Sequence, residues 1–284
     1  MGYGAARHLI AAGHIPTLHQ VGRCYDYMAG LFEMLCDGNL HAGYWESAQD
    51  RTPLAEAQER LTDWLIRRTP VSAGSRVLDV GCGNGSPALA LARKTGCAVV
   101  GITLSHEQTR TANQRTSAAW LHQQAFFLQT DAMEMPFGSE TFDATWALES
   151  IFHMERSHVL SEMARILRPG GRVLIADLIE KQPLSNQERA LIFSLSQCRS
   201  VVHLEDYPGL LQRAGFRVVE VLDISPNVGR SFAEVGRLVE SRREIVTRAY
   251  GHIAVEFMLR MFPRATAIFE QKMGYALVVG EKMA

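Results

Sequence analysis

The chain has 284 residues, of which 47% are hydrophobic and 21% charged, and its formal net charge is −1. This balance is typical of an ordinary globular protein and excludes a global positive field that would recruit nucleic acid or acidic membranes. Five cysteines without any Cys-x-x-Cys pair argue against a disulfide framework or a zinc site and favour a reducing, cytoplasmic setting.

The first 70 residues predict a helical arm and cap. Residues 1–16 allow two interpretations, a frayed end or an arm that packs on a neighbouring subunit of a homo-oligomer. A helix then begins near Thr17, because apolar residues recur at helical spacing; they are Leu18, Val21, Tyr25, Met28, Phe32 and Leu35. A second helix is expected from about Thr52, its predicted N-cap, to about Arg68. Apolar runs stay shorter than a membrane span, so no membrane partner is expected.

The stretch 76–90 reads RVLDVGCGNGSPALA, and the rest of the chain is organised around it. A short apolar strand ends in Gly81, Gly83 and Gly85, and a helical pattern follows, which predicts the first β-α unit of a nucleotide-binding sheet. The glycines allow unusual backbone angles and the close approach of a ligand. A dinucleotide-binding loop would place its third glycine at Ser86, one residue later than here. The spacing therefore disfavours a nicotinamide-dependent oxidoreductase.

Residues 71–182 alternate between strands and helices. Strands are predicted at 76–80, 98–103, 125–129, 142–147 and 172–177. The helices between them are predicted to end at Lys94, to begin at Ser105, and to span 156–167. This alternation predicts a parallel sheet that helices cover on both faces.

Residues 183–284 are expected to complete this core and to add a helical lid. Helices are predicted at 183–200 and 204–214, and strands at 216–222 and 275–279. Two long helical segments lie between these strands, with apolar faces from Phe232 to Val246 and from Ala254 to Phe269. Their position suggests a lid over the carboxyl ends of the strands, where open α/β sheets bind ligands. All three regions are expected to form one compact unit.

Six phrases of the chain match one known family in a single collinear order; they are GNLHAGYW, VLDVGCGNG, GITLS, TDAMEMPF, FDATWALESIFHM and LRPGGRVLIAD. The sequence resembles the class I small-molecule methyltransferases, a family that includes rebeccamycin sugar O-methyltransferase and the spinosyn-pathway methyltransferases. This resemblance implies a Rossmann-like three-layer sandwich with a seven-stranded, mostly parallel sheet. It also implies S-adenosyl-L-methionine (AdoMet) as cofactor, S-adenosyl-L-homocysteine (AdoHcy) as its product, and no metal.

The resemblance also implies a cofactor site. Asp79 would orient the glycine loop or bind the amino group of AdoMet, and Gly81, Gly83 and Gly85 would lie against its methionine and ribose. The other implied contacts are Tyr25 and Tyr44 in the cap, Thr103, Leu104 and Gln108 at the ribose, Asp131 and Ala132 at adenine, and Ala147 beneath the methionine chain. Two residues have simpler alternatives, since Gln108 could be an exposed helical residue and Asp131 could cap the following turn.

His153 is the candidate base for methylation of a hydroxyl, because an imidazole titrates near neutral pH. By the same resemblance, Asp177 pairs with this histidine and Glu149 lines the reaction chamber. The alternative is that His153 only packs beside Met154. Aromatic residues are expected to form an apolar acceptor site for a lipophilic small molecule; they are Phe152, Phe193, Phe257 and Phe262.

Two other reactions stay open at this point. In C-methylation of an alkene or prenyl chain, aromatic side chains would shelter a carbocation, and Glu149, Asp177, Glu180 or His153 would remove a proton. A prenyl diphosphate would require a basic cluster; the candidates, which could equally form a solvated helix face, are Arg230, Arg237, Arg242, Arg243 and Arg248. The other reaction is a cyclisation in which AdoMet serves only as a structural ligand.

Overall fold

The computed structural model describes residues 17–284, so the arm expected at residues 1–16 lies outside the described residues. Over the described range, seven strands form one sheet. The strands are β1 (Arg76–Val80), β2 (Ala98–Thr103), β3 (Ala125–Gln129), β4 (Phe142–Leu148), β5 (Leu167–Glu180), β6 (Phe216–Asp223) and β7 (Met273–Lys282). The helices are α2 (Leu18–Cys36), α3 (Leu54–Ile66), α4 (Ser86–Thr95), α5 (His106–Ala118), the short 3-10 helix η1 (Ile151–His153), α6 (Arg156–Ile166), α7 (Asn186–Ser196), α8 (Asp206–Arg213), α9 (Ser225–Val228), α10 (Ser231–Ser241), α11 (Arg243–Tyr250) and α12 (His252–Lys272).

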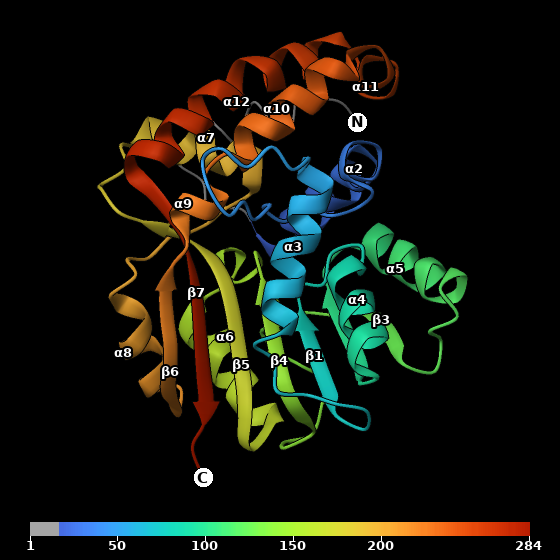
Figure 1. Ribbon diagram of the computed structural model, residues 1–284, viewed down its shortest axis with the longest axis vertical. Coiled ribbons are helices and arrows are strands. Elements are labelled where there is room, and N and C mark those ends of the chain that lie inside the picture. Colours follow the sequence, from blue (N-terminus) through green and yellow to red (C-terminus); the bar gives the residue numbers. More distant parts are fainter. Residues whose placement is uncertain (1–16) are drawn as a thin grey trace.

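The sheet has the order β3-β2-β1-β4-β5-β7-β6 (Figure 1). Strands β1 to β5 pair in parallel, and β7 lies antiparallel between β5 and β6. The chain therefore moves outward in one direction from β1 and in the other from β4. Open α/β sheets bind ligands outside the carboxyl ends of strands at such a switch point. The predicted mostly parallel, seven-stranded sheet is confirmed.

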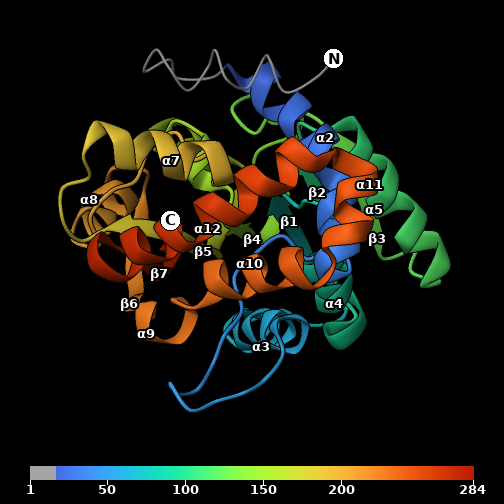
Figure 2. The ribbon, with the colours of Figure 1, turned by 90° about the horizontal axis from the view of Figure 1, so that it is seen from above.

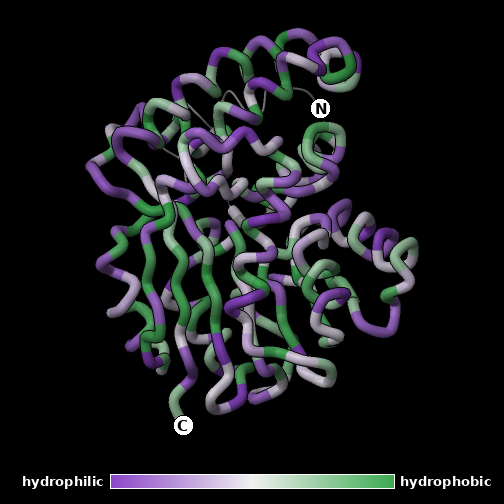
Figure 3. The backbone as a smooth tube through the Cα atoms, in the orientation of Figure 1, coloured by the Kyte–Doolittle hydropathy of each residue, from purple (hydrophilic) through white to green (hydrophobic). Residues whose placement is uncertain are grey.

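Helices cover both faces of this sheet, which explains the unbroken apolar run of β1. Val77 packs with residues of α3, α4 and α5 on one face. Leu78 and Val80 pack with residues of α6 and α8 on the other face. Figure 3 shows the central strands as mainly hydrophobic, whereas the helices above them alternate in hydropathy. Burial on two faces removes the alternation that a half-exposed strand would show.

A helical layer lies across the carboxyl ends of the strands. Figures 1 and 2 show α10 and α12 side by side there, with α11 near α2. A separate hydrophobic cluster joins Leu31 and Leu35 of α2 to Val239, Val246 and Val255 of the lid. The predicted lid is thus present, and it shares a core with the amino-terminal cap. Among the described residues, no helix combines the length and the apolar character needed to cross a bilayer.

Several predicted element boundaries were wrong: the helix expected at 183–200 spans Asn186–Ser196, and the strand expected at 275–279 spans Met273–Lys282. Three further differences have a structural reason. The first long lid segment breaks at Arg242 into α10 and α11, and Ile245 is 56% exposed rather than part of the buried face. Pro53, not Thr52, is the N-cap of α3, and the hydroxyl of Thr52 donates to Asp50 instead. Strand β5 begins at Leu167 and not at residue 172 as predicted, because residues 168–171 (Arg-Pro-Gly-Gly) are accommodated as an irregularity in its pairing with β4.

Candidate functional site

A cavity of about 280 Å³ lies between the sheet and the helices above it. Its floor comes from the carboxyl ends of β1, β2 and β4 and the loops that follow them. Its roof comes from α2, α10 and α12. Among its described lining residues there are carboxylates and histidines but no Lys or Arg. The cavity therefore suits a ligand that is cationic or neutral better than one that carries a phosphate.

The glycine loop forms the part of the floor that follows β1. Gly81 and Gly83 line the cavity with φ of 80° and 53°, and Gly85 begins α4 with φ of 82°. A Cβ atom at Gly81 would lie 2.2 Å from the Cβ of Ser150, and one at Gly83 would lie 2.5 Å from Leu40. These positions need glycine for both backbone angle and space. Gly85 serves packing instead, because it lies against Phe127 and outside the cavity lining.

Asp79 is a buried carboxylic acid that faces the cavity. Within the described residues it accepts no hydrogen bond and forms no ion pair, and burial raises the pKa of Asp79 to about 7. The neighbouring Asn84 also has a buried Oδ1 without a hydrogen-bond partner. A buried, unpaired acid is costly unless a cation or donor completes it. The observation fits an ammonium-bearing ligand beside the glycine loop.

The ends of β2 and β3 place in the cavity lining the residues that were predicted to contact the nucleoside. Thr103 and Gln108 are buried in the cavity lining, and the Thr103 hydroxyl donates to Gln108 Oε1 over 2.7 Å. Leu104 lines the cavity as well. Asp131 and Ala132 also line it, while Asp131 Oδ1 accepts from the Met133 amide. Asp131 thus caps its turn, as one interpretation expected, and still faces the cavity.

His153 lies in the cavity wall as a neutral imidazole with a defined proton position. Its Nδ1 donates to the Gln197 carbonyl over 2.8 Å, since a carbonyl oxygen can only accept. Its Nε2 therefore accepts, and the hydroxyl of Tyr25 in α2 donates to it over 2.8 Å. Burial lowers the pKa of His153 to about 4, so the ring is uncharged at neutral pH. Nε2 of His153 therefore faces the side of the cavity on which α2 lies.

Glu149 follows β4 and connects three parts of the molecule. Its Oε1 accepts from the amide of Ala42, which lies in the loop between α2 and α3 (residues 37–53, the cap loop), and from the hydroxyl of Tyr275 in β7. Its backbone adopts the left-handed region, with φ of 50°, which is uncommon for a residue with a side chain. Burial raises the pKa of Glu149 to about 7. Such partners indicate a residue that holds the cap loop in place.

Some predicted site residues do not reach the cavity. Asp177 does not contact His153; it is fully buried and pairs with Arg156 and Tyr207. Tyr44 stacks on Trp64, and Ala147 is buried in the sheet core. Of the predicted acceptor-site aromatics, three line the cavity: Phe152, Phe257 and Phe262. The side chain of Phe193 lies outside the described part of the structure.

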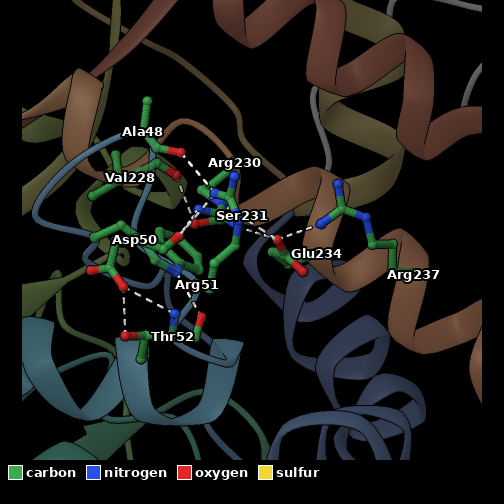
Figure 4. Close-up of polar contacts among 10 residues, drawn as sticks. Ala48, Asp50, Arg51, Thr52, Val228, Arg230, Ser231, Glu234 and Arg237 are labelled. Carbon is green, nitrogen blue, oxygen red and sulfur yellow. Dashed lines mark hydrogen bonds and ion pairs between the residues drawn. The ribbon is translucent and has the colours of Figure 1, made fainter.

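The arginines considered for a diphosphate are engaged with acidic residues or backbone. Figure 4 shows Arg230 and Arg237 directed at Glu234. Both pair with Glu234 Oε1, over 2.9 and 2.5 Å, and Arg230 also donates to the Asp50 carbonyl. The other candidates are similarly paired: Arg242 with the Met34 carbonyl, Arg243 with Glu240 and Glu256, and Arg248 with Glu244. These arginines therefore hold the lid and the cap loop in place and do not line the cavity.

Sequence reasoning missed several cavity residues. Gln197 supplies the carbonyl that orients His153, and Gln58 presents a buried Oε1 without a partner. Gly22 allows α2 to approach the Leu104 carbonyl, which a Cβ at that glycine would meet at 3.0 Å. The glycine inside an otherwise apolar helix was a usable signal. No local pattern marks Gln58 or Gln197, because their roles depend on contacts distant in sequence.

Comparison with known proteins now identifies the family. Residues 78–175 match the methyltransferase domain family. Methyltransferase GfsG of Streptomyces halstedii is 43% identical over 210 residues, which cover 72% of this chain and 76% of that protein. The chain is an AdoMet-dependent methyltransferase. The methyltransferase is also 36% identical over 273 residues to the 27-O-demethylrifamycin SV methyltransferase of Amycolatopsis mediterranei (strain S699), covering 94% of this chain and 98% of that protein.

A solved structure supports the same fold for the methyltransferase. The cyclase SpnF superposes with a TM-score of 0.82 at 29% identity, covering 95% of this chain and 97% of that chain. The residues of the cavity fit AdoMet, since a buried acid without a partner among the described residues and a glycine loop open to close approach suit a ligand that carries an ammonium group. AdoMet is therefore the cofactor of the methyltransferase.

Proposed function

We propose that this methyltransferase transfers the methyl group of AdoMet to a hydroxyl of a neutral, lipophilic natural product, with His153 as the base. One observation carries the proposal: Nε2 of His153 already accepts a hydrogen bond from a hydroxyl group at the cavity, that of Tyr25. The acceptor alcohol would take the place of this phenol. AdoMet supplies an electrophilic methyl group on a sulfonium centre.

Different residues of the site would then bind the cofactor, bind the acceptor and take up the proton. Asp79 and the loop through Gly81 and Gly83 hold the cofactor, and the apolar lid residues hold the acceptor so that its oxygen lies in line with the methyl group. As the new O–CH3 bond forms and the S–CH3 bond breaks, the alcohol oxygen becomes a strong acid. Nε2 of His153 takes its proton, and a base of low pKa is sufficient for so acidic a group.

The lining of the cavity argues for a neutral acceptor. Among the described lining residues no Lys or Arg is present, so a diphosphate would have no cationic partner there. Phe257 and Phe262 of α12 and Met258 between them present apolar surface instead. Burying an unpaired phosphate charge costs far more than burying an unpaired hydroxyl. C-methylation of a prenyl diphosphate is therefore disfavoured relative to methylation of an alcohol.

The test uses AdoMet with a labelled methyl group and three acceptor probes: 27-O-demethylrifamycin SV, the neutral prenyl alcohol farnesol, and geranyl diphosphate. We expect label in a methyl ether of a hydroxylated neutral probe and none in geranyl diphosphate. Label in geranyl diphosphate alone would contradict the proposal. A cyclised product without label would support the alternative of a cyclase, for which the likeness to SpnF is the observation in favour.

His153→Gln tests the base. The variant keeps a hydrogen-bonding side chain but cannot take the proton, so we expect kcat to fall by about 100-fold or more. The dissociation constant for AdoHcy, measured by calorimetry, should change by less than about twofold, because the histidine is not assigned to cofactor binding. An unchanged kcat would remove His153 from the chemistry.

A further inference from the structure

A buried polar network lies beside the site and ends at the segment that orients His153. Arg156 of α6 and Asp177 of β5 pair over 2.8 Å, with 5% and 0% of their side chains exposed. The hydroxyl of Tyr207 in α8 donates to the same carboxylate oxygen, Asp177 Oδ2, over 2.5 Å. Burial alone would lower the pKa of Arg156, but the Asp177 carboxylate raises it, so the guanidinium stays charged.

Arg156 makes its other hydrogen bonds with Ser200, the last residue of the segment 197–200. Its Nη1 donates to Ser200 Oγ over 2.6 Å, and its Nη2 donates to the Ser200 carbonyl over 3.1 Å. The amides of Arg199 and Ser200 both donate to the carbonyl of Phe152, over 3.0 and 3.3 Å. The segment is therefore held on one side by Arg156 and on the other by the turn that carries His153.

Gln197 lies at the start of this segment and adopts a left-handed backbone, with φ of 55°. That conformation is costly for a residue other than glycine and persists only where surrounding contacts impose it. It directs the Gln197 carbonyl at Nδ1 of His153, which donates to it over 2.8 Å. This hydrogen bond keeps the proton on Nδ1 and leaves the lone pair on Nε2, where the proposed reaction needs it.

We propose that Arg156 and Asp177 are positioning residues for His153, acting through the segment 197–200. Asp177 orients the guanidinium, the guanidinium anchors Ser200, and the anchored segment presents the Gln197 carbonyl to the imidazole. The inference rests on the proposed function, in which His153 is the base. It assigns Asp177 a role through Arg156 instead of the direct pairing with His153 that the sequence suggested.

A contribution to the stability of the folded protein does not by itself explain why this network is present. A buried ion pair costs desolvation that its attraction often only balances, and apolar residues of similar volume would serve the core as well. Arg165, on the same helix, offers a comparison at a more exposed position, with 35% of its side chain exposed: it pairs with Glu162 and donates to the carbonyls of Phe137 and Met135. Arg165 has the same kinds of partners, but among the described residues it makes no hydrogen bond with the segment 197–200.

The experiment compares Arg156→Lys with Arg165→Lys in the full chain. Lysine keeps the charge beside Asp177 but cannot bond both Ser200 oxygens and the carboxylate in one geometry. We expect Arg156→Lys to lower kcat by about tenfold with an unchanged KM for AdoMet, and Arg165→Lys to leave both within about twofold. Ser200→Ala, which removes only one hydrogen bond, should lower kcat by about threefold and serves if Arg156→Lys folds poorly.

A second measurement needs no acceptor. Nitrogen NMR of isotope-labelled histidine, with His153→Gln to identify the signal, should show His153 of the parent chain protonated at Nδ1 alone. Arg156→Lys should show both tautomers. Normal kcat and an unchanged tautomer in Arg156→Lys would overturn the inference, even if the variant melts at a lower temperature.

A double variant separates this inference from the proposed function. If Arg156 acts through His153, then His153→Gln with Arg156→Lys should lose no more kcat than His153→Gln alone. Additive losses would contradict the inference while leaving His153 as the base. Full activity of His153→Gln would instead contradict the proposed function, and the tautomer measurement would still decide whether Arg156 orients the ring.

Discussion

At the residue scale, Glu149 shows how a plausible catalytic acid can have a different task. Its Oε1 is occupied by the Ala42 amide and the Tyr275 hydroxyl, which tie the cap loop and β7 to the end of β4. Its other carboxylate oxygen, Oε2, makes no hydrogen bond with the described residues, so kinetics of variants must separate this holding role from a role as base. Nε2 of His153, in contrast, accepts from the Tyr25 hydroxyl, which the acceptor alcohol would displace in the proposed reaction.

Glu149→Gln therefore separates the two candidates. The amide oxygen can still accept both hydrogen bonds, so we expect kcat to stay within about threefold of the parent value, against the loss of about 100-fold for His153→Gln. Steady-state kinetics of the two variants with the same acceptor checks this. A loss in Glu149→Gln as large as that in His153→Gln would make Glu149 the base.

The motifs and the family resemblance predicted many residues that line the cavity, but not the relations between side chains. Asp79, Gly81, Gly83 and Asp131 occupy the cavity wall as the sequence motifs indicate. Asp177 was misassigned, because a sequence shows that an acid ends a strand but not that an arginine from another element neutralises it. Such pairing is decided by packing between elements, which has no local signal.

At the element scale, α12 forms much of the roof and presents Phe257 and Phe262 to the cavity. On the same helix Ile253 is 70% exposed. Truncation of Phe257 or Phe262 would therefore change the cavity wall, whereas truncation of Ile253 would change only the outer surface of the same helix.

Phe257→Ala and Phe262→Ala should each raise the KM for the acceptor by roughly tenfold, because each removes part of the apolar surface that would bury it. Ile253→Ala is the control and should leave KM unchanged. The dissociation constant for AdoHcy should stay the same in all three variants. Acceptor kinetics and calorimetry measure these values, and an equal effect of Ile253→Ala would remove the lid from acceptor binding.

Hydrophobic periodicity predicted the bounds of an element well where its residues share one environment, such as burial, from end to end. The predicted bounds of β1, β2 and β3 agree with the structure, because their apolar runs are buried and their ends carry turn residues. The lid was predicted less well. Its first segment divides at Arg242, where the guanidinium donates to the Met34 carbonyl of α2. That contact joins distant parts of the chain, so periodicity could not indicate it.

At the scale of the whole molecule, the fold brings the cofactor loop, the base and the lid together from distant parts of the chain. The βα rhythm predicted a parallel sheet, whereas the order of its strands and the antiparallel place of β7 between β5 and β6 were not predicted and come from the structure. The switch point between β1 and β4 then places Asp79 and Glu149 in one cavity. Both acids are buried, and burial raises the pKa of each to about 7.

These raised pKa values make stability depend on pH. An acid whose pKa is higher in the folded state than in the unfolded state favours unfolding as it ionises, so stability falls as pH rises from about 4 to about 7. Asp79→Asn removes that cost. We expect it to stabilise the ligand-free protein by about 2 kcal/mol at pH 8, which raises Tm by roughly 4–8 °C, and to have little effect at pH 4.

Cofactor binding by Asp79→Asn tests the central claim most directly. Calorimetric titration with AdoHcy is done on the parent chain, on Asp79→Asn and on Asp63→Asn, a control whose carboxylate pairs with Lys94 at the surface. We predict one AdoHcy bound per parent chain, unchanged binding in the control, and at least about tenfold weaker binding in Asp79→Asn despite its higher Tm. No binding by the parent chain, or equal affinity in all three proteins, would contradict the placement of the cofactor against the glycine loop.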